Sequence, residues 1–227
     1  MAMRNAMSRE FAVAFLREHG FGLPADKHRA HAWVLDRARE GNLDAQCVLA
    51  TLYWTGLTGS PDEALAYEWC QVAAESGSQD AQCALASHLV SGAGSGRDAE
   101  RGVRMLQDLV AAGHLPAMVS LGLLFLSGGC EAVPKDPKAA LDVLLRPAQA
   151  DDGLSQCLLG MEMMLDPDPL VQRQGLAWIE LAAVNGSATA HRYLAGHYRS
   201  GGAGFEISLE KAEVHESMAD SLDADAT

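Results

Sequence analysis

Residues 44–50 read Asp-Ala-Gln-Cys-Val-Leu-Ala, and residues 80–86, 36 positions later, read Asp-Ala-Gln-Cys-Ala-Leu-Ala. The same frame returns after another 36 residues at 116–122, as Pro-Ala-Met-Val-Ser-Leu-Gly. Less regular copies follow at 155–160 and 190–195. Self-similarity at a period of roughly 20 to 50 residues is typical of repeat proteins. The sequence therefore predicts an array of repeated units rather than a fold with one central core.

Each copy carries the signals of two helices. Four copies close their first half on a glycine, namely Gly56, Gly92, Gly128 and Gly201. A glycine at this place fits a left-handed C-cap. The second helix of a copy is expected to start at Ser60, as N-cap, with Pro61 in the first turn. Asp136 followed by Pro137 repeats this pattern in the fourth copy.

The second half of a copy keeps its own spacing. Counted from Asp62, Ala66 lies four positions on, Trp69 seven, Ala73 eleven and Gly77 fifteen. Residues of this kind at four, seven and eleven form one face of a helix. A single helix pair cannot bury such a face, so neighbouring copies must stack on each other. The pattern predicts an all-α solenoid with a concave and a convex surface.

The expected organisation is one solenoid over residues 9–217, made of about six helix-turn-helix repeats. Residues 218–227 contain several aspartates and no basic residue, and they are expected to form a solvated acidic C-terminal tail. The expected repeats lie near 9–43, 44–79, 80–115, 116–153, 154–187 and 188–217.

These residues resemble the Sel-one-like repeat, a relative of the tetratricopeptide repeat. The resembling pattern is Ala-x-x-x-Leu-Gly-x-x-Tyr-x-x-Gly followed by Asp-x-x-x-Ala-x-x-Trp-x-x-x-Ala-Ala-x-x-Gly. The copy from Ala45 to Gly77 matches nearly all of it, with Ala50 in place of the family glycine. The resemblance implies a right-handed α/α superhelix that acts as an adaptor or scaffold, as bacterial relatives do in signalling and secretion. It carries over no catalytic residue.

By similarity to the tetratricopeptide relative, the first helix of each repeat lines the concave groove. The groove positions lie two before and two, five and six after the repeat Leu, and the first of them holds Cys47, Cys83 and Cys157. The middle of the groove is apolar and would grip an amphipathic helix. The alternative is that these side chains pack between repeats. The candidate partner-binding residues are Trp54, Val90, Val119, Leu123, Leu126, Met161, Met164, Arg192 and Arg199.

Arg192 and Arg199 lie seven residues apart on one helix face of an otherwise acidic chain. They would pair with a carboxylate of the partner. The alternative is a structural role, in which the two arginines bridge to Glu206 or Glu210.

The charge of the chain excludes some partners. The 227 residues include 17 basic and 30 acidic side chains, a formal net charge of −13. Nucleic-acid binding needs a basic surface that displaces counterions from phosphates, so neither nucleic acid nor an anionic membrane is expected. No secretory signal or spanning segment is recognisable, and the cysteine count is odd, which favours a reduced, cytoplasmic compartment.

No pattern of an active site, metal site or cofactor site is found. The sequence has no Cys-x-x-Cys motif, and equivalent cysteines on stacked helices are too far apart to share a zinc ion. The glycine-rich stretches follow no strand and match no nucleotide fingerprint. Secreted relatives carry disulfides within a repeat, which makes a Cys47–Cys70 bond conceivable, but free thiols are favoured here.

The leading hypothesis is a protein-binding adaptor or scaffold, and its more specific form is a bacterial regulatory, secretion or immunity-type adaptor. Its partner would be another protein with a basic or amphipathic helical surface, and the chain itself would be a monomer or associate weakly. The alternatives are a structural protein that self-associates through its terminal repeats and, less favoured, a hydrolase with its site in the groove.

Overall fold

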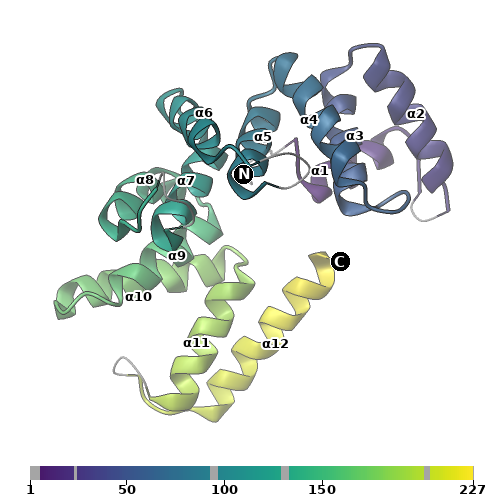
Figure 1. Ribbon diagram of the computed structural model, residues 1–227. Helices are drawn as coiled ribbons and strands as arrows, with labels where there is room; N and C mark the ends of the chain where they lie inside the picture. Colours follow the sequence, from purple (N-terminus) through teal and green to yellow (C-terminus); the bar gives the residue numbers. More distant parts are fainter. Residues whose placement is uncertain (1–5, 23–24, 93–96, 129–132, 202–204, 227) are drawn as a thin grey trace. The chain divides into compact units, whose positions relative to one another are not determined.

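The computed structural model describes residues 6–22, 25–92, 97–128, 133–201 and 205–226. Within these ranges the chain forms twelve α-helices joined by short turns, which confirms the expected all-α repeat fold (Figure 1). The helices are α1 (Arg9–Glu18), α2 (Lys27–Arg39), α3 (Leu43–Thr55), α4 (Glu63–Glu75), α5 (Gln79–Ser91), α6 (Ala99–Ala111), α7 (Leu115–Ser127), α8 (Pro137–Gln149), α9 (Gly153–Met163), α10 (Pro169–Val184), α11 (Ala188–Ser200) and α12 (Leu209–Ala226).

The helices form two compact units, one with α1–α7 and one with α8–α12. In the first unit the packed neighbours include α2 with α3, α3 with α4, α4 with α5 and α5 with α6. In the second unit α9 packs against α8 and α10, and α11 packs against α12. Most helices thus pack mainly against their neighbours in sequence, as expected of a solenoid, whereas α1 packs against α3.

The first helix of each repeat begins in the same way. A side chain three residues before the repeat Ala or Ser accepts a hydrogen bond from that residue's amide, which satisfies one of the free N–H groups of the first turn. The capping residues are Asn42, Ser78, His114, Asp152 and Ser187. This shared cap explains why the frame recurs with so little drift, because the start of every first helix is set by the same local bond.

The predicted glycine C-caps are confirmed. Gly56, Gly92, Gly128 and Gly201 have φ of 66°, 85°, 64° and 71°. This left-handed region costs residues with a Cβ roughly 1–2 kcal/mol. Each of these glycines donates its N–H to the carbonyl four residues earlier and so ends the helix.

The start of the second helix is predicted correctly in one copy and wrongly in another. Asp136 caps α8 and Pro137 is its first residue, as expected. In α4, however, the N-cap is Asp62 rather than Ser60, and its side chain accepts from Leu65 N at 3.0 Å. Pro61 belongs to the turn instead, where it packs closely against Gly56. A Cβ on Gly56 would lie only 2.6 Å from Pro61 Cδ. The proline packs under the preceding glycine and delays the helix by two residues.

Some helix pairs approach so closely that only glycine fits between them. A Cβ on Gly160 of α9 would lie 2.5 Å from the Gly175 carbonyl oxygen of α10, and a Cβ on Gly175 would lie 2.7 Å from Gly160 O. In α6, a Cβ on Gly102 would lie 2.5 Å from Ala86 O. Small residues at these positions let two backbones meet, which sets the crossing of the two helices of a repeat.

The C-terminal segment differs from the expected acidic tail. Helix α12 continues to Ala226, so residues 218–226 are helical. Ala219 is fully buried, and Asp223 forms an ion pair with Arg192 of α11. The aspartates therefore extend the last helix, because α11 offers both an apolar contact and a countercharge to this segment.

Candidate functional site

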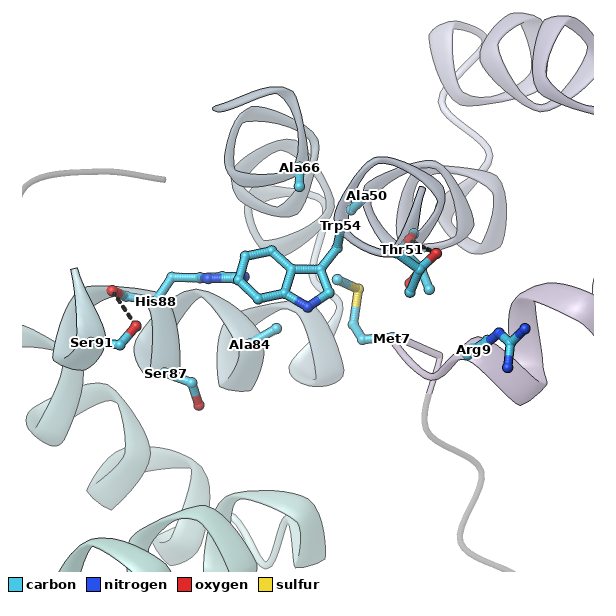
Figure 2. A pocket seen from close by; sticks show the side chains of 11 residues that line it. Met7, Arg9, Ala50, Thr51, Trp54, Ala66, Ala84, Ser87, His88 and Ser91 are labelled. Atoms are coloured by element: carbon cyan, nitrogen blue, oxygen red, sulfur yellow. Dashed lines mark hydrogen bonds between the residues drawn. The ribbon is translucent and has the colours of Figure 1, made fainter. Parts of the chain in front are cut away.

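A pocket of about 490 Å³ opens in the first unit between α3 and α5. The residues that line it include Ala50 of α3, Ala66 of α4 and Ala84 of α5. Met7 and Arg9, from the start of the chain and of α1, line it as well (Figure 2). The predicted groove positions of the second and third repeats supply much of the wall, namely Thr51, Trp54, Thr55, Ser87 and Ser91.

Trp54 is the largest side chain of this pocket, and 43% of its surface is exposed. Its indole lies against the imidazole of His88 in an edge-on arrangement, with 4.6 Å between the ring centroids (Figure 2). Burial lowers the pKa of His88, against the opposing effect of Glu63, so the imidazole is neutral at pH 7. The pocket thus offers a wide aromatic edge with no charge on it, which suits an apolar group.

The hydroxyl groups of the pocket wall are turned to their own helices. Thr51 Oγ1 donates to Cys47 O at 3.0 Å, Thr55 Oγ1 donates to Thr51 O at 2.7 Å, and Ser87 Oγ donates to Cys83 O at 3.1 Å. These bonds use the hydroxyl protons and leave oxygen lone pairs as acceptors. Because none of these three protons goes to an imidazole, the three hydroxyls lack the activation that a nucleophile requires.

Next to the pocket, one carboxylate ties three segments of the first unit together. Asp80 Oδ1 lies 3.0 Å from His114 Nε2, and Asp80 Oδ2 accepts the main-chain N–H of Ala6 at 2.7 Å. The hydrogen bond to Asp80, followed by the contact with Cys83, raises the pKa of His114 to about 9. Protonation of His114 has a cost, since its Nδ1 accepts the cap bond from Ala117 N at 3.3 Å and a proton there would break that bond.

Cys83, His114 and Asp80 have the residue types of a catalytic triad, but their bonding is that of a structural cluster. In a triad, one imidazole nitrogen faces the nucleophile and the other faces the carboxylate. In this protein Nε2 faces Asp80 and Nδ1 caps α7 through Ala117. Cys83 is buried.

The candidate groove residues of the first unit divide by exposure. Trp54 is the most exposed, and Leu123 of α7 is 40% exposed. Val119 and Leu126, on the same helix, are half-buried. Val90 is 6% exposed and packs in a core cluster, so the expectation that it faces the groove is wrong. Val90 packs against Gly102 of α6, where the absence of a side chain leaves room for it. A Cβ on Gly102 would lie only 2.8 Å from Val90 Cγ2.

The cysteines at the groove position before the repeat Leu are also buried, against expectation. Cys47, Cys83 and Cys157 all lie in core clusters. Cys47 Sγ donates to Ser78 Oγ at 3.3 Å, and Cys70 Sγ donates to Ala81 O at 3.2 Å, so both are free thiols. Burial raises the pKa of Cys47, and it raises that of Cys70 to about 12.

In the second unit, the candidate residues are used within the chain. Met161 and Met164 are half-buried and pack against the cluster of Cys157, Ile179 and Leu194. The alternative interpretation, packing between helices, therefore describes the two methionines well.

The two arginines of α11 also have partners within the chain. Arg192 pairs with Asp223, and Arg199 Nη2 lies 2.7 Å from Glu216 Oε2. Both carboxylates belong to α12, whereas the sequence pointed to Glu206 or Glu210. The hydrogen bond from Arg199 lowers the pKa of Glu216.

Sequence reasoning missed Met7, Asp80 and His88 as members of the site. His88 lies between two groove positions of α5, and its spacing resembles that of a core-facing residue. Met7 precedes the first helix and belongs to no repeat, so no periodic signal marks it. In the described ranges, no three His, Cys, Asp or Glu side chains lie together in a way that would hold a metal ion.

The comparison with known families identifies the repeat. The Sel1 repeat model matches residues 10–35, 43–78, 79–114, 115–142 and 153–187, and the chain belongs to this family. Sel1 repeats generally mediate contacts between proteins, and their fold is typically non-enzymatic. No helix in the described part of the chain has both the length and the apolar character needed to cross a bilayer.

Solved structures show the same fold. A Sel1 repeat protein from Oxalobacter formigenes is 25% identical, with a TM-score of 0.76 over 94% of this chain and 86% of that one. The immunity protein Pa5087 from Pseudomonas aeruginosa is 18% identical, with a TM-score of 0.67 over 96% and 84%. The immunity protein PA5088 from the same organism is 19% identical, with a TM-score of 0.65 over 95% and 82%. No curated protein matches.

Proposed function

We propose that this protein is an adaptor that binds a partner protein through the pocket between α3 and α5. The observation that carries the proposal is Trp54, a tryptophan with 43% of its surface exposed at the wall of an apolar pocket. Tryptophan is enriched among the residues that dominate binding energy at protein interfaces. Membership of a family whose repeats mediate protein contacts supports the same role.

The charges of the chain indicate the chemistry of the partner. The net charge is −13, and the hydroxyls of the pocket wall present acceptor oxygens rather than donors. Such a surface suits a partner rich in N–H donors and positive charge around an apolar anchor. Complementary charge would speed the encounter and reject acidic competitors. We therefore propose a partner with a basic or amphipathic surface.

A bacterial immunity-type role is the most specific form of this proposal. Two structures with the same fold are named immunity proteins, at 18% and 19% identity. In this form the adaptor would hold one cognate protein with fixed stoichiometry. The shared fold supports this role in general, whereas the chemistry of the partner is inferred from the pocket.

The experiment compares capture by the wild type, Trp54→Glu and Val184→Glu from native extract. Val184 is 82% exposed in α10 and does not line the pocket, so its substitution makes the same charge change at a residue outside the proposed site. We expect a stoichiometric partner that the wild type and Val184→Glu retain and Trp54→Glu loses, because a carboxylate in the pocket would have to be desolvated. A partner held equally by all three proteins would contradict the pocket assignment.

Self-association is the second candidate, and the last helix supports it. Val214 and Met218 are each 48% exposed on α12. Stacking of two copies through this face would bury them. A mass that rises with concentration in light scattering, together with no captured partner, would favour this candidate over the adaptor.

A further inference from the structure

The pocket between α3 and α5 is already touched by a segment of the same chain. Residues 6–8 precede α1, and Met7 among them lines the pocket. Ala6 and Met7 pack against the core cluster that includes Cys47, Ala50 and Leu85. Figure 2 shows Met7 and Trp54 among the side chains that line this pocket.

This segment is held at both of its ends. On one side, the main-chain N–H of Ala6 donates to Asp80 Oδ2 at 2.7 Å, a charge-assisted bond. On the other side, Ser8 is the N-cap of α1 and accepts from Phe11 N at 3.1 Å. Asp80 is itself positioned by His114, 3.0 Å from its other oxygen. The carboxylate is therefore fixed before any segment binds to it.

The contacts of this segment fall into two kinds. One is a main-chain N–H on a fixed carboxylate, and the other is an unbranched apolar side chain that lines a pocket with an aromatic wall and packs on the adjacent core cluster. Neither depends on the segment being part of this chain. A main-chain donor is present in almost any peptide, and a long flexible side chain adapts to an irregular pocket. Any extended peptide with the same two features could make the same contacts.

We infer that the pocket recognises a short extended segment of the partner protein, which presents an unbranched apolar side chain beside Trp54 and the preceding main-chain N–H to Asp80. Ala6 and Met7 occupy this place in the free protein, and the partner displaces them. The inference rests on the proposed function and adds to it the form of the ligand. Because the internal segment competes, it lowers the apparent affinity for the partner by the fraction of time that it is bound.

The first part of the test asks whether Met7 contributes to the pocket wall beside Trp54. The full chain is labelled with 5-fluorotryptophan, and the Trp54 resonance is assigned with Trp54→Phe. We expect Met7→Asp to shift the Trp54 resonance, because an aspartate would leave the apolar pocket. Leu170→Asp, an equivalent apolar-to-acidic change at a residue of α10 that is 63% exposed, should leave it in place. A Trp54 resonance that ignores Met7→Asp would overturn the inference.

The second part supplies the segment as a separate molecule. The probe is a peptide of residues 4–10, Arg-Asn-Ala-Met-Ser-Arg-Glu, added to the full-chain Met7→Asp protein. We expect saturable binding in the millimolar range or tighter, with the Trp54 resonance returning toward its wild-type position. Short tethers give effective concentrations of about that size, so no saturation by about 10 mM would overturn the inference.

Three controls define the recognition. The same peptide with Asp in place of Met7 should bind at least about tenfold more weakly, since the apolar anchor is lost. Asp80→Asn combined with Met7→Asp should also weaken binding, because the charged acceptor is gone. The wild-type chain should need at least about fivefold more peptide than Met7→Asp, because its own segment competes. Equal binding in any of these comparisons would contradict the part of the inference that it tests.

Failure of this inference can be told from failure of the proposed function. The peptide experiment uses no natural partner, so peptide binding with no captured protein would keep the recognition mode and remove the adaptor role. Capture of a partner that is lost in Trp54→Glu but insensitive to the peptide and to Met7→Asp would keep the adaptor role and overturn the recognition mode.

Discussion

The second and the last repeat use the same frame but treat equivalent groove positions differently. Trp54 lies five residues after the repeat Leu in α3, and Arg199 lies five residues after it in α11. Trp54 lines an open pocket, whereas Arg199 forms an ion pair with Glu216 of α12. An aromatic side chain at this position cannot form an ion pair with a neighbouring helix, whereas an arginine in an acidic chain can. The repeat pattern thus sets the position on the helix, and the type of residue decides whether that position lines a pocket or contacts a neighbouring helix.

The two repeats also differ in how their first helix ends. Gly56 and Gly201 both have positive φ, but a Cβ on Gly56 would lie 2.6 Å from Pro61 Cδ and 2.9 Å from Pro61 N, whereas one on Gly201 would lie 3.0 Å from the Ile207 side chain. The proline ring and backbone cannot move aside as the isoleucine can. We predict that Gly56→Ala lowers the free energy of unfolding by about 3 kcal/mol and Gly201→Ala by about 1 kcal/mol.

Urea unfolding followed by circular dichroism would measure both glycine variants. Gly77→Ala serves as the control for φ alone, since its φ is 98° and a Cβ there meets nothing within 4 Å. If Gly56→Ala cost no more than Gly77→Ala, the tight turn under α3 would not contribute to stability.

The histidine beside the pocket should respond to pH in one direction. The folded-state pKa of His114 is raised to about 9, above its usual 6.5, so its pairing with Asp80 stabilises the fold fully below pH 6.5 and is lost as the pH rises toward 9. The shift corresponds to at most about 3 kcal/mol, and loss of the cap bond to Ala117 removes about 1 of it. We predict that wild type exceeds His114→Asn by about 2 kcal/mol at pH 6 and by little above pH 9.

His114→Asn is a matched variant because asparagine is a good N-cap and does not titrate. Free energies of unfolding at a series of pH values from 6 to 9.5 would measure the difference. A constant difference between the two proteins over this range would exclude a proton-linked contribution from the pair.

The histidines of the last repeat should respond in the opposite direction. His191 Nδ1 and His215 Nδ1 lie 2.9 Å apart, so one must donate and the other accept. Burial, and then His191, lowers the pKa of His215, so the contribution of this pair is present above pH 6.5 and is lost as the pH falls below it. Tyr198 stacks on His215, and the acidic Glu216 lies next to it in sequence. We predict that acidification loosens α12, by less than about 1 kcal/mol because His215 is partly exposed to solvent.

Hydrogen exchange of α12 at pH 7 and pH 5.5, corrected for the intrinsic rates, would measure this effect. His215→Gln should show a smaller difference between the two pH values than the wild type. The same acidification should leave the Asp80–His114 contact intact. If α12 and the pocket region loosened together, the two histidine sites would not act independently.

The repeat fold could be predicted from the sequence because local bonds repeat with it. The cap three residues before each repeat Ala or Ser and the left-handed glycine after each first helix depend on neighbours along the chain. The start of α4 was predicted wrongly because it depends on a contact outside the helix itself. Pro61 looked like a helix start, but it is held in the turn by Gly56, a contact that no single-helix rule contains.

The candidate site could be predicted only in part. Three of the groove positions taken from the family frame, Thr51, Trp54 and Ser87, line one pocket. The same frame placed Val90 in the groove, although it packs in the core, because small differences in helix crossing rotate a side chain from one surface to another. Met7 lies outside every repeat and reached the site through tertiary contacts alone.

Period, caps and glycine breaks are properties of the chain over a few residues, so the sequence alone specified a stack of helix pairs. Which groove positions stay open depends on contacts between residues far apart in the chain. Asp80 receives Ala6 from 74 positions away, and Arg192 finds Asp223 31 positions on. Such pairs follow no period, since they form only once packing has brought the helices together. The tertiary structure therefore decided that α3 and α5 present a pocket and that α11 is closed by α12.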